Sequence, residues 1–174
     1  VLEAWTKAVA GRILIIAHVG GTCQADCIEL ARHAAGLGGV DAVGTVAPFY
    51  LKPGSVEELV AFYKPIAAAC APLPFYAYHI PSMTVIDFLK NGSKEIPNLN
   101  GIKFTSNNFM EMIECIRFDG GRFDILNGFD EMLLCGMAVG ARGGVGSTYN
   151  YSLRTYQNIY DAFMAGDLEQ ARAA

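Results

Sequence analysis

One lysine stands inside a stretch that otherwise has the pattern of a buried β-strand. Residues 99–106 read LNGIKFTS, with Lys103 between two large apolar residues. Lysine is among the residues least often buried, because burying its charged form costs free energy unless the amine is paired, deprotonated or used in chemistry. The alternation of a strand puts Ile102 and Phe104 on one face and Lys103 on the other, with Thr105. The pattern predicts that Lys103 faces the interior of a barrel of strands.

A tyrosine on the preceding predicted strand supplies a chemical partner for this lysine. In PFYAYHIP (74–81), the same alternation places Tyr76 and Tyr78 together on the inner face. Desolvation lowers the pKa of an amine, and a neutral amine can attack a carbonyl carbon to form a Schiff base. A phenol beside it can shuttle protons. Lys103 and Tyr78 therefore fit a Schiff-base centre, and the alternative is a lysine paired with a carboxylate such as Asp130.

The elements that must position these residues alternate between strands and helices. Alternation of this kind indicates an α/β fold with a parallel sheet. A (β/α)8 TIM barrel is favoured over a doubly wound sheet because the polar, reactive residues fall at the C-terminal ends of the predicted strands, where barrel enzymes place their sites. Those residues are His18, Tyr50, Tyr78, Lys103, Asp130 and Ser147. The predicted strands are 12–21, 40–50, 74–81, 99–106, 122–130 and 143–150.

Length and composition bound the remaining possibilities. The chain has 174 residues, of which 52% are hydrophobic and 17% charged, and its net charge is −4. A complete barrel needs roughly 250 residues, so we expect one partial TIM-barrel domain over 1–174, with about six of the eight βα units.

The acidic balance argues against a nucleic-acid or acidic membrane partner, and the apolar runs are too short to span a membrane. The five cysteines lack CxxC spacing, so we expect reduced thiols in the cytoplasm and no metal.

Four motifs together resemble a known family. YHIP, LNGIKFT, NGFDE and GGVGSTYN are similar to the N-acetylneuraminate lyase branch of the dihydrodipicolinate synthase/N-acetylneuraminate lyase family, the pyruvate-dependent class I aldolases. The resemblance covers essentially the whole chain. It implies that Lys103 is the Schiff-base lysine and Tyr78 the proton-shuttling tyrosine, with no metal or organic cofactor.

The resemblance also implies a binding site for a polyhydroxylated sugar and a subunit contact. Tyr50 matches a tyrosine that reaches toward the site of a neighbouring subunit, which implies a homotetramer. The glycines near Ser147 permit close approach of backbone to a ligand or between packed strands. Asp130 and Glu131 also precede a predicted helix, so an alternative is that they stabilise its N-terminus. The residues matching sugar ligands are Thr105, Gly128, Asp130, Glu131 and Ser147.

The implied reaction is the cleavage of N-acetylneuraminate, a sialic acid, to N-acetylmannosamine and pyruvate. One alternative is another pyruvate-dependent 2-keto acid aldolase of the family. The other is a non-catalytic fragment that associates with full-length subunits. The family's first two strands, with the GTTGE-like loop that holds the pyruvate carboxylate, have no counterpart in the sequence. We therefore expect the 174-residue chain to be inactive unless these elements come from elsewhere.

Overall fold

The structure is a computed structural model that describes residues 1–79 and 83–174. The chain forms two compact units, residues 1–102 and residues 103–174. The boundary falls within strand β4, Leu99–Phe104. The expected single domain over 1–174 stays a prediction.

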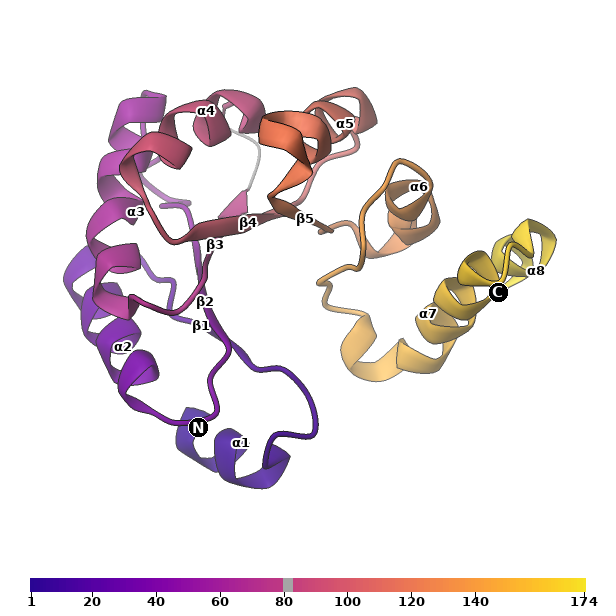
Figure 1. The fold of residues 1–174 in the computed structure, drawn as a ribbon, viewed down its shortest axis with the longest axis horizontal. Helices are drawn as coiled ribbons and strands as arrows, with labels where there is room; N and C mark the ends of the chain where they lie inside the picture. The colour runs from indigo at the N-terminus through magenta and orange to yellow at the C-terminus, as the bar shows by residue number, and fades with distance from the viewer. Residues whose placement is uncertain (80–82) are drawn as a thin grey trace. The chain divides into compact units, whose positions relative to one another are not determined.

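Strands and helices alternate strictly in the first unit, as the sequence pattern predicts. Figure 1 shows helices α2 and α3 along one side of strands β1 to β3. The elements are α1 (Leu2–Val9), β1 (Ile16–His18), α2 (Gln24–Gly36), β2 (Ala42–Val46), α3 (Val56–Cys70), β3 (Phe75–His79), α4 (Val85–Glu95) and the first part of β4.

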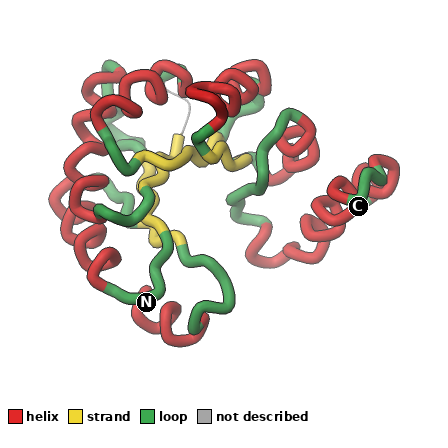
Figure 2. Tube along the Cα trace, in the orientation of Figure 1, coloured by secondary structure: helices red, strands yellow, loops and turns green. Residues whose placement is uncertain are grey.

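The strands follow chain order in one sheet, β1-β2-β3-β4-β5. β1 pairs in parallel with β2, and β2 with β3. Parallel neighbours need a crossover connection, and here α2 and α3 supply it. Figure 2 shows the strands of this unit side by side, with the helices outside them.

The core of the first unit lies between its strands and helices. Tyr63 of α3 packs edge-on against Phe75 of β3 and Phe88 of α4, with ring centroids 5.7 and 5.4 Å apart. Such pairs add stability beyond the apolar area that they bury. Helix α3 begins after Ser55, whose hydroxyl accepts a hydrogen bond from the backbone N–H of Glu58 and so caps the helix.

The second unit has more helix and less strand. Helices α7 and α8 contact each other, and Figure 1 shows them next to each other. The elements are α5 (Phe109–Arg117), the 3₁₀ turn η1 (Phe118–Gly121), β5 (Asp124–Asn127), the 3₁₀ turn η2 (Asp130–Met132), α6 (Leu133–Ala138), α7 (Tyr149–Met164) and α8 (Leu168–Ala173).

The sixth predicted strand, 143–150, is wrong in extent. It is reduced to an isolated parallel bridge between Asn127 and Gly144, and α7 begins at Tyr149. Glycine weakens a strand because it has no side chain to pack and loses more conformational freedom on ordering. Three glycines within four residues therefore leave a loop where a strand was predicted.

Among the described residues, no helix is both long and apolar enough to cross a membrane.

Candidate active site

Tyr78 lies on the face of the first unit that turns away from the helices. In the sheet register, His18 pairs with Gly44, Gly44 with Tyr76, and Val46 with Tyr78, so these side chains share one face. Tyr76 and Tyr78 are half-buried, whereas the residues between and beside them on β3 are buried. The predicted alternation of β3 is confirmed.

His18 contacts the ring of Tyr78 edge-on, with the centroids 6.4 Å apart and the planes at 72°. The two residues come from β1 and β3, which flank β2. Gly44 of β2, which pairs with His18, has no side chain on this face. Strand alternation places both side chains on one face but does not predict that the two rings meet.

The backbone of Tyr78 is held from two sides. Its carbonyl oxygen accepts hydrogen bonds from the hydroxyl of Tyr63 at 3.2 Å and from the backbone N–H of Ala47 at 3.3 Å. Burial raises the pKa of Tyr63 far above its ordinary value, so this hydroxyl stays a donor at any physiological pH. The end of β3 is thereby fixed to both β2 and α3.

His79 points toward the helices, as the alternation of β3 predicts. It is buried, and its Nε2 lies 3.0 Å from the carbonyl oxygen of Met83. Ile80 and Pro81, which complete the YHIP motif, lie outside the described residues.

Lys103 lies near the end of β4 in the predicted alternation. Ile102 and Phe104 are fully buried, and Lys103 between them is half-buried. The side chain therefore leaves the strand on the opposite face from its two apolar neighbours. That it meets Tyr78 stays a prediction.

Thr105 and Gly128 lie against each other in the second unit. The backbone N–H of Gly128 donates to the carbonyl oxygen of Phe104 at 2.8 Å. A Cβ atom at Gly128 would stand 2.2 Å from the Thr105 hydroxyl oxygen, so only glycine fits here. That hydroxyl is buried, and no described residue hydrogen-bonds to it. A buried hydroxyl without a partner costs free energy, and a ligand hydroxyl or water would relieve that cost.

Asp130 is buried and held by the residue that precedes α7. Its Oδ2 accepts hydrogen bonds from the backbone N–H of Thr148 at 2.7 Å and from the Thr148 hydroxyl at 2.5 Å. Asp130 is 7% exposed, so these charge-assisted bonds offset part of the cost of removing a carboxylate from water. The donors come from Thr148, just before α7, rather than from α6, which begins at Leu133 after the turn η2.

The other predicted sugar ligands of this unit are more open. Glu131 and Ser147 are both exposed, next in sequence to the buried Asp130 and to Thr148. Glu131 follows Asp130, and Ser147 precedes Thr148. The hydrogen bonds between Asp130 and Thr148 therefore fix the backbone from which both exposed side chains extend.

Burial and the Asp130 carboxylate raise the pKa of Tyr149 to about 12. Its hydroxyl is buried and lies close to Gly144, where a Cβ atom would stand 2.7 Å from it. The neutral phenol thus persists beside an acidic side chain.

Tyr50 stands on an exposed tip between β2 and α3. Phe49, Tyr50 and Leu51 are 51%, 84% and 81% exposed. Three neighbouring large apolar side chains in water are unusual on a free surface and typical of a contact site. This placement supports the predicted role of Tyr50 at a subunit contact, which stays a prediction.

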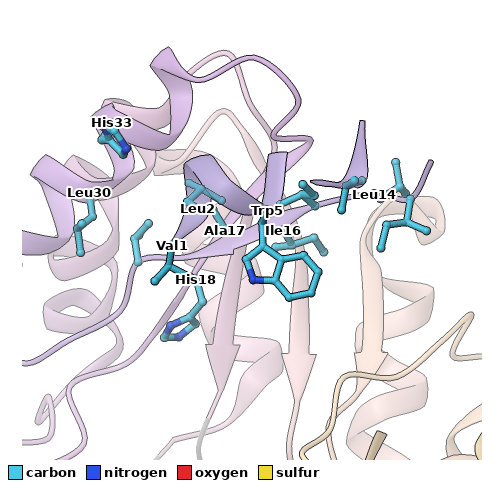
Figure 3. Close-up of a pocket in the computed structure, with 13 residues that line it drawn as sticks. Val1, Leu2, Trp5, Leu14, Ile16, Ala17, His18, Leu30 and His33 are labelled. Carbon is cyan, nitrogen blue, oxygen red and sulfur yellow. The ribbon is translucent and has the colours of Figure 1, made fainter. Parts of the chain in front are cut away.

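An apolar cavity of about 590 Å³ opens between α1, β1 and α2. Figure 3 shows its lining, which includes Trp5, Ile16 and His18. No carboxylate is among the residues that line it. One lining residue, His18, contacts the ring of Tyr78, a predicted catalytic residue. Among the described residues, no group of three or more His, Cys, Asp or Glu side chains could hold a metal ion.

Two residues of the second unit escaped the sequence reasoning. Thr148 and Tyr156 are linked, with the Thr148 hydroxyl oxygen 2.7 Å from the Tyr156 hydroxyl. The available signal was the threonine inside GSTYN, because Thr is favoured at positions that precede a helix.

Comparisons with known proteins identify the family of the chain. The model of the dihydrodipicolinate synthetase family matches residues 1–174. The chain is 42% identical to N-acetylneuraminate lyase A of Xenopus laevis over 98% of its own length and 57% of that protein. It thus spans a little over half the length of such curated relatives.

Solved structures give the same result for the fold. The N-acetylneuraminate lyase of Proteus mirabilis matches with a TM-score of 0.92 and 38% identity, over 98% of this chain and 59% of that one. The sialic acid aldolase of Aliivibrio salmonicida matches with a TM-score of 0.93 and 39% identity, over 99% and 58%. The dihydrodipicolinate synthase of Aquifex aeolicus matches with a TM-score of 0.86 and 30% identity, over 99% and 59%. These matches confirm the predicted fold class, a part of the (β/α)8 barrel.

Proposed function

Because the chain belongs to the dihydrodipicolinate synthetase family, we propose that it is part of an aldolase that cleaves N-acetylneuraminate to N-acetylmannosamine and pyruvate through an imine on Lys103. The observation that carries the proposal is a lysine that leaves β4 between two fully buried residues, in a chain 42% identical to an N-acetylneuraminate lyase.

In the proposed reaction, the neutral amine of Lys103 attacks the 2-keto carbon, and water leaves to form the imine. Tyr78 takes the proton from the hydroxyl on the carbon whose bond breaks. The electron pair of that C–C bond moves into the protonated imine, and the sugar aldehyde departs. Protonation of the resulting enamine and hydrolysis of the imine then release pyruvate and free the lysine. No metal or organic cofactor takes part.

We propose that the sugar end of the substrate is bound by Thr105, Gly128, Asp130, Glu131 and Ser147. The buried, unpartnered hydroxyl of Thr105 and the buried carboxylate of Asp130 support this assignment. Carboxylates accept well from the hydroxyls of a polyol. The alternative is another pyruvate-dependent aldolase of the family, for example one that acts on a semialdehyde. A semialdehyde has no such hydroxyls, so the same residues argue against an aldolase of that kind.

Trapping with borohydride tests the proposal. We expect reduction of the full-length form in the presence of saturating pyruvate to leave a pyruvyl adduct at Lys103, detected by mass spectrometry of peptides. Lys103→Met should abolish the adduct, whereas Lys90→Met, at an exposed lysine, should not. An unmodified Lys103 would leave the non-catalytic fragment that associates with full-length subunits. Release of N-acetylmannosamine from N-acetylneuraminate then separates the proposed lyase from other pyruvate-dependent aldolases.

The assembly and location are further parts of the proposal. We propose a homotetramer in the full-length form, with Tyr50 at a subunit contact, because its tip is apolar and exposed. Tyr50→Ala should lower the assembled fraction in sedimentation, and Tyr151→Ala, at another exposed tyrosine, should not. We also place the protein in the cytoplasm, which cell fractionation would test.

A further inference from the structure

The Asp130 carboxylate is held asymmetrically. Both hydrogen bonds that the described residues give it go to Oδ2, from the backbone N–H and the hydroxyl of Thr148. The described residues give Oδ1 no hydrogen bond, and it lies against Gly146, where a Cβ atom would stand 1.6 Å from Oδ1 and 2.5 Å from Oδ2. One oxygen is therefore engaged by the protein, and the other retains its capacity to accept.

The hydroxyl of Thr148 is itself oriented by Tyr156. A carboxylate only accepts, so the single hydroxyl proton of Thr148 goes to Asp130. The Tyr156 hydroxyl, 2.7 Å from the Thr148 oxygen, must then donate to it. Tyr156, Thr148 and Asp130 thus form a directed chain in which every donor has a defined acceptor.

The surroundings keep this chain in place. Tyr156 packs edge-on against Tyr149, with ring centroids 4.3 Å apart. Thr148 directly precedes α7, whose first turn ends at a kink at Ser152, and its backbone N–H donates to Oδ2 of Asp130 at 2.7 Å. The chain of hydroxyls orients Asp130 without placing another charge near it.

We propose that Thr148 and Tyr156 are positioning residues that hold Asp130 by Oδ2 and present Oδ1 to a hydroxyl of the substrate's polyol tail. This inference rests on the proposed function, because it takes the ligand to be the polyol of a sialic acid. Neither positioning residue touches the reacting atoms. Their effect is on the binding of polyol-bearing sugars, because a carboxylate free to rotate accepts a given hydroxyl less well.

The test uses N-acetylmannosamine, whose open-chain form carries the polyol tail and which has no 2-keto acid, so that it forms no pyruvate-type imine. It is titrated into the ¹⁵N-labelled 174-residue chain while the amide signals of residues 146–150 are followed. Thr148→Val removes the hydroxyl and keeps the shape, whereas Thr148→Ser restores the hydroxyl. Tyr156→Phe removes only the last hydroxyl of the chain. Tyr160→Phe, at a tyrosine of the same helix that is also half-buried, is the matched control.

We expect Thr148→Val to weaken binding by about tenfold and Tyr156→Phe by about threefold, on the scale of one net hydrogen bond. Thr148→Ser should restore binding to near that of the unsubstituted chain, and Tyr160→Phe should not change it. A structural role alone would not separate the valine variant from the serine variant in this way. If Thr148→Val does not fold, the comparison of Tyr156→Phe with Tyr160→Phe carries the test.

Equal affinity of Thr148→Val and Thr148→Ser, or of Tyr156→Phe and Tyr160→Phe, would overturn the inference. So would the absence of any shift of these amides at saturating sugar in the unsubstituted chain. Borohydride trapping with pyruvate on the unsubstituted full-length form tests the proposed function separately. An adduct without sugar binding removes this inference alone, and sugar binding without an adduct removes the imine chemistry alone.

Discussion

The two units fix their candidate site residues by different means. In the first unit, Tyr78 is held by the strand ladder, with β3 in register against β2 and its carbonyl oxygen bonded to Ala47 and Tyr63. In the second unit, Asp130 lies beyond the end of β5 and is held by the side chain and backbone of Thr148, 18 residues later.

The difference lies in how many interactions one substitution can remove. A strand position is fixed by several backbone hydrogen bonds, which most side-chain changes leave intact. A loop position fixed by side-chain bonds loses its support when a single group is displaced. We therefore expect the second unit to be more sensitive to single substitutions near its site, and the following measurements test this difference.

The largest effect is expected at Gly146, in the second unit. In Gly146→Ala, the new Cβ atom would meet the Asp130 carboxyl carbon at 2.1 Å as well as its oxygens, so the whole group must leave Thr148. The loss of two charge-assisted hydrogen bonds should lower the free energy of unfolding by about 3 kcal/mol, measured by urea denaturation.

Gly143→Ala is the matched control for this substitution. Its Cβ atom would meet nothing closer than Leu126 at 3.8 Å, an ordinary contact, so a change of at most about 0.5 kcal/mol is expected. Equal losses in the two variants would show that the Asp130 contact is not the cause.

A smaller loss is expected at Gly20, the corresponding close approach in the first unit. A Cβ atom there would stand 2.7 Å from both the backbone nitrogen of Val46 and the His18 ring. The exposed His18 ring can move, but the Val46 nitrogen belongs to β2 and must shift with its backbone, so we expect Gly20→Ala to cost about 2 kcal/mol in urea denaturation. Gly21→Ala, with only Cys27 at 3.9 Å, should be near neutral. A loss at Gly20 larger than that at Gly146 would reverse the comparison.

Tyr63→Phe removes one of the two hydrogen bonds to the Tyr78 carbonyl oxygen. The ring still packs on Phe75 and Phe88, and the Ala47 N–H still donates, so we expect a loss of about 1 kcal/mol in the free energy of unfolding. Tyr151→Phe, at an exposed tyrosine, should leave stability unchanged. A loss of more than about 3 kcal/mol would mean that the first unit also depends on single side-chain bonds.

The smallest effect concerns Tyr149 at high pH. Its pKa is raised to about 12 in the folded chain, against about 10 in an unfolded one. The unfolded chain therefore loses this proton at a lower pH than the folded chain does. The contribution of the neutral phenol to the free energy of unfolding is fully present below pH 10 and is lost as the pH rises through 12.

Because Tyr149 is only partly buried, solvent screening should keep this contribution below about 1 kcal/mol. Urea denaturation at pH 9 and pH 11 should show a steeper decline for the unsubstituted chain than for Tyr149→Phe. Tyr160→Phe controls for the loss of a tyrosine from the same helix. Parallel declines in the unsubstituted chain and Tyr149→Phe would contradict the shifted pKa.

The sequence predicts what depends on periodicity. The buried pair around Lys103 and the shared face of Tyr76 and Tyr78 both follow from spacing within a few residues, and the structure confirms them. The family follows from short motifs that carry the residue types its chemistry needs, and the comparisons confirm it.

What escaped prediction depends on contacts between distant residues. The bond from Thr148 to Asp130 joins positions on two loops, and no local rule says which oxygen of the carboxylate is used. The contact of His18 with Tyr78 spans an intervening strand. The sixth strand failed because its alternation was weighed without the cost of its glycines, which left only the bridge at Gly144.

The hydroxyl of Tyr63 links the helices of the first unit directly to the end of β3. Helix α3 packs between α2 and α4, and through this one donor its position is transmitted to the peptide that carries the Tyr78 phenol. Substitutions on the water-facing side of that layer would thus shift the phenol that we propose as the proton shuttle. Adaptation to heat or cold at such positions would then alter the proposed reactivity without changing any residue that we assign to the site.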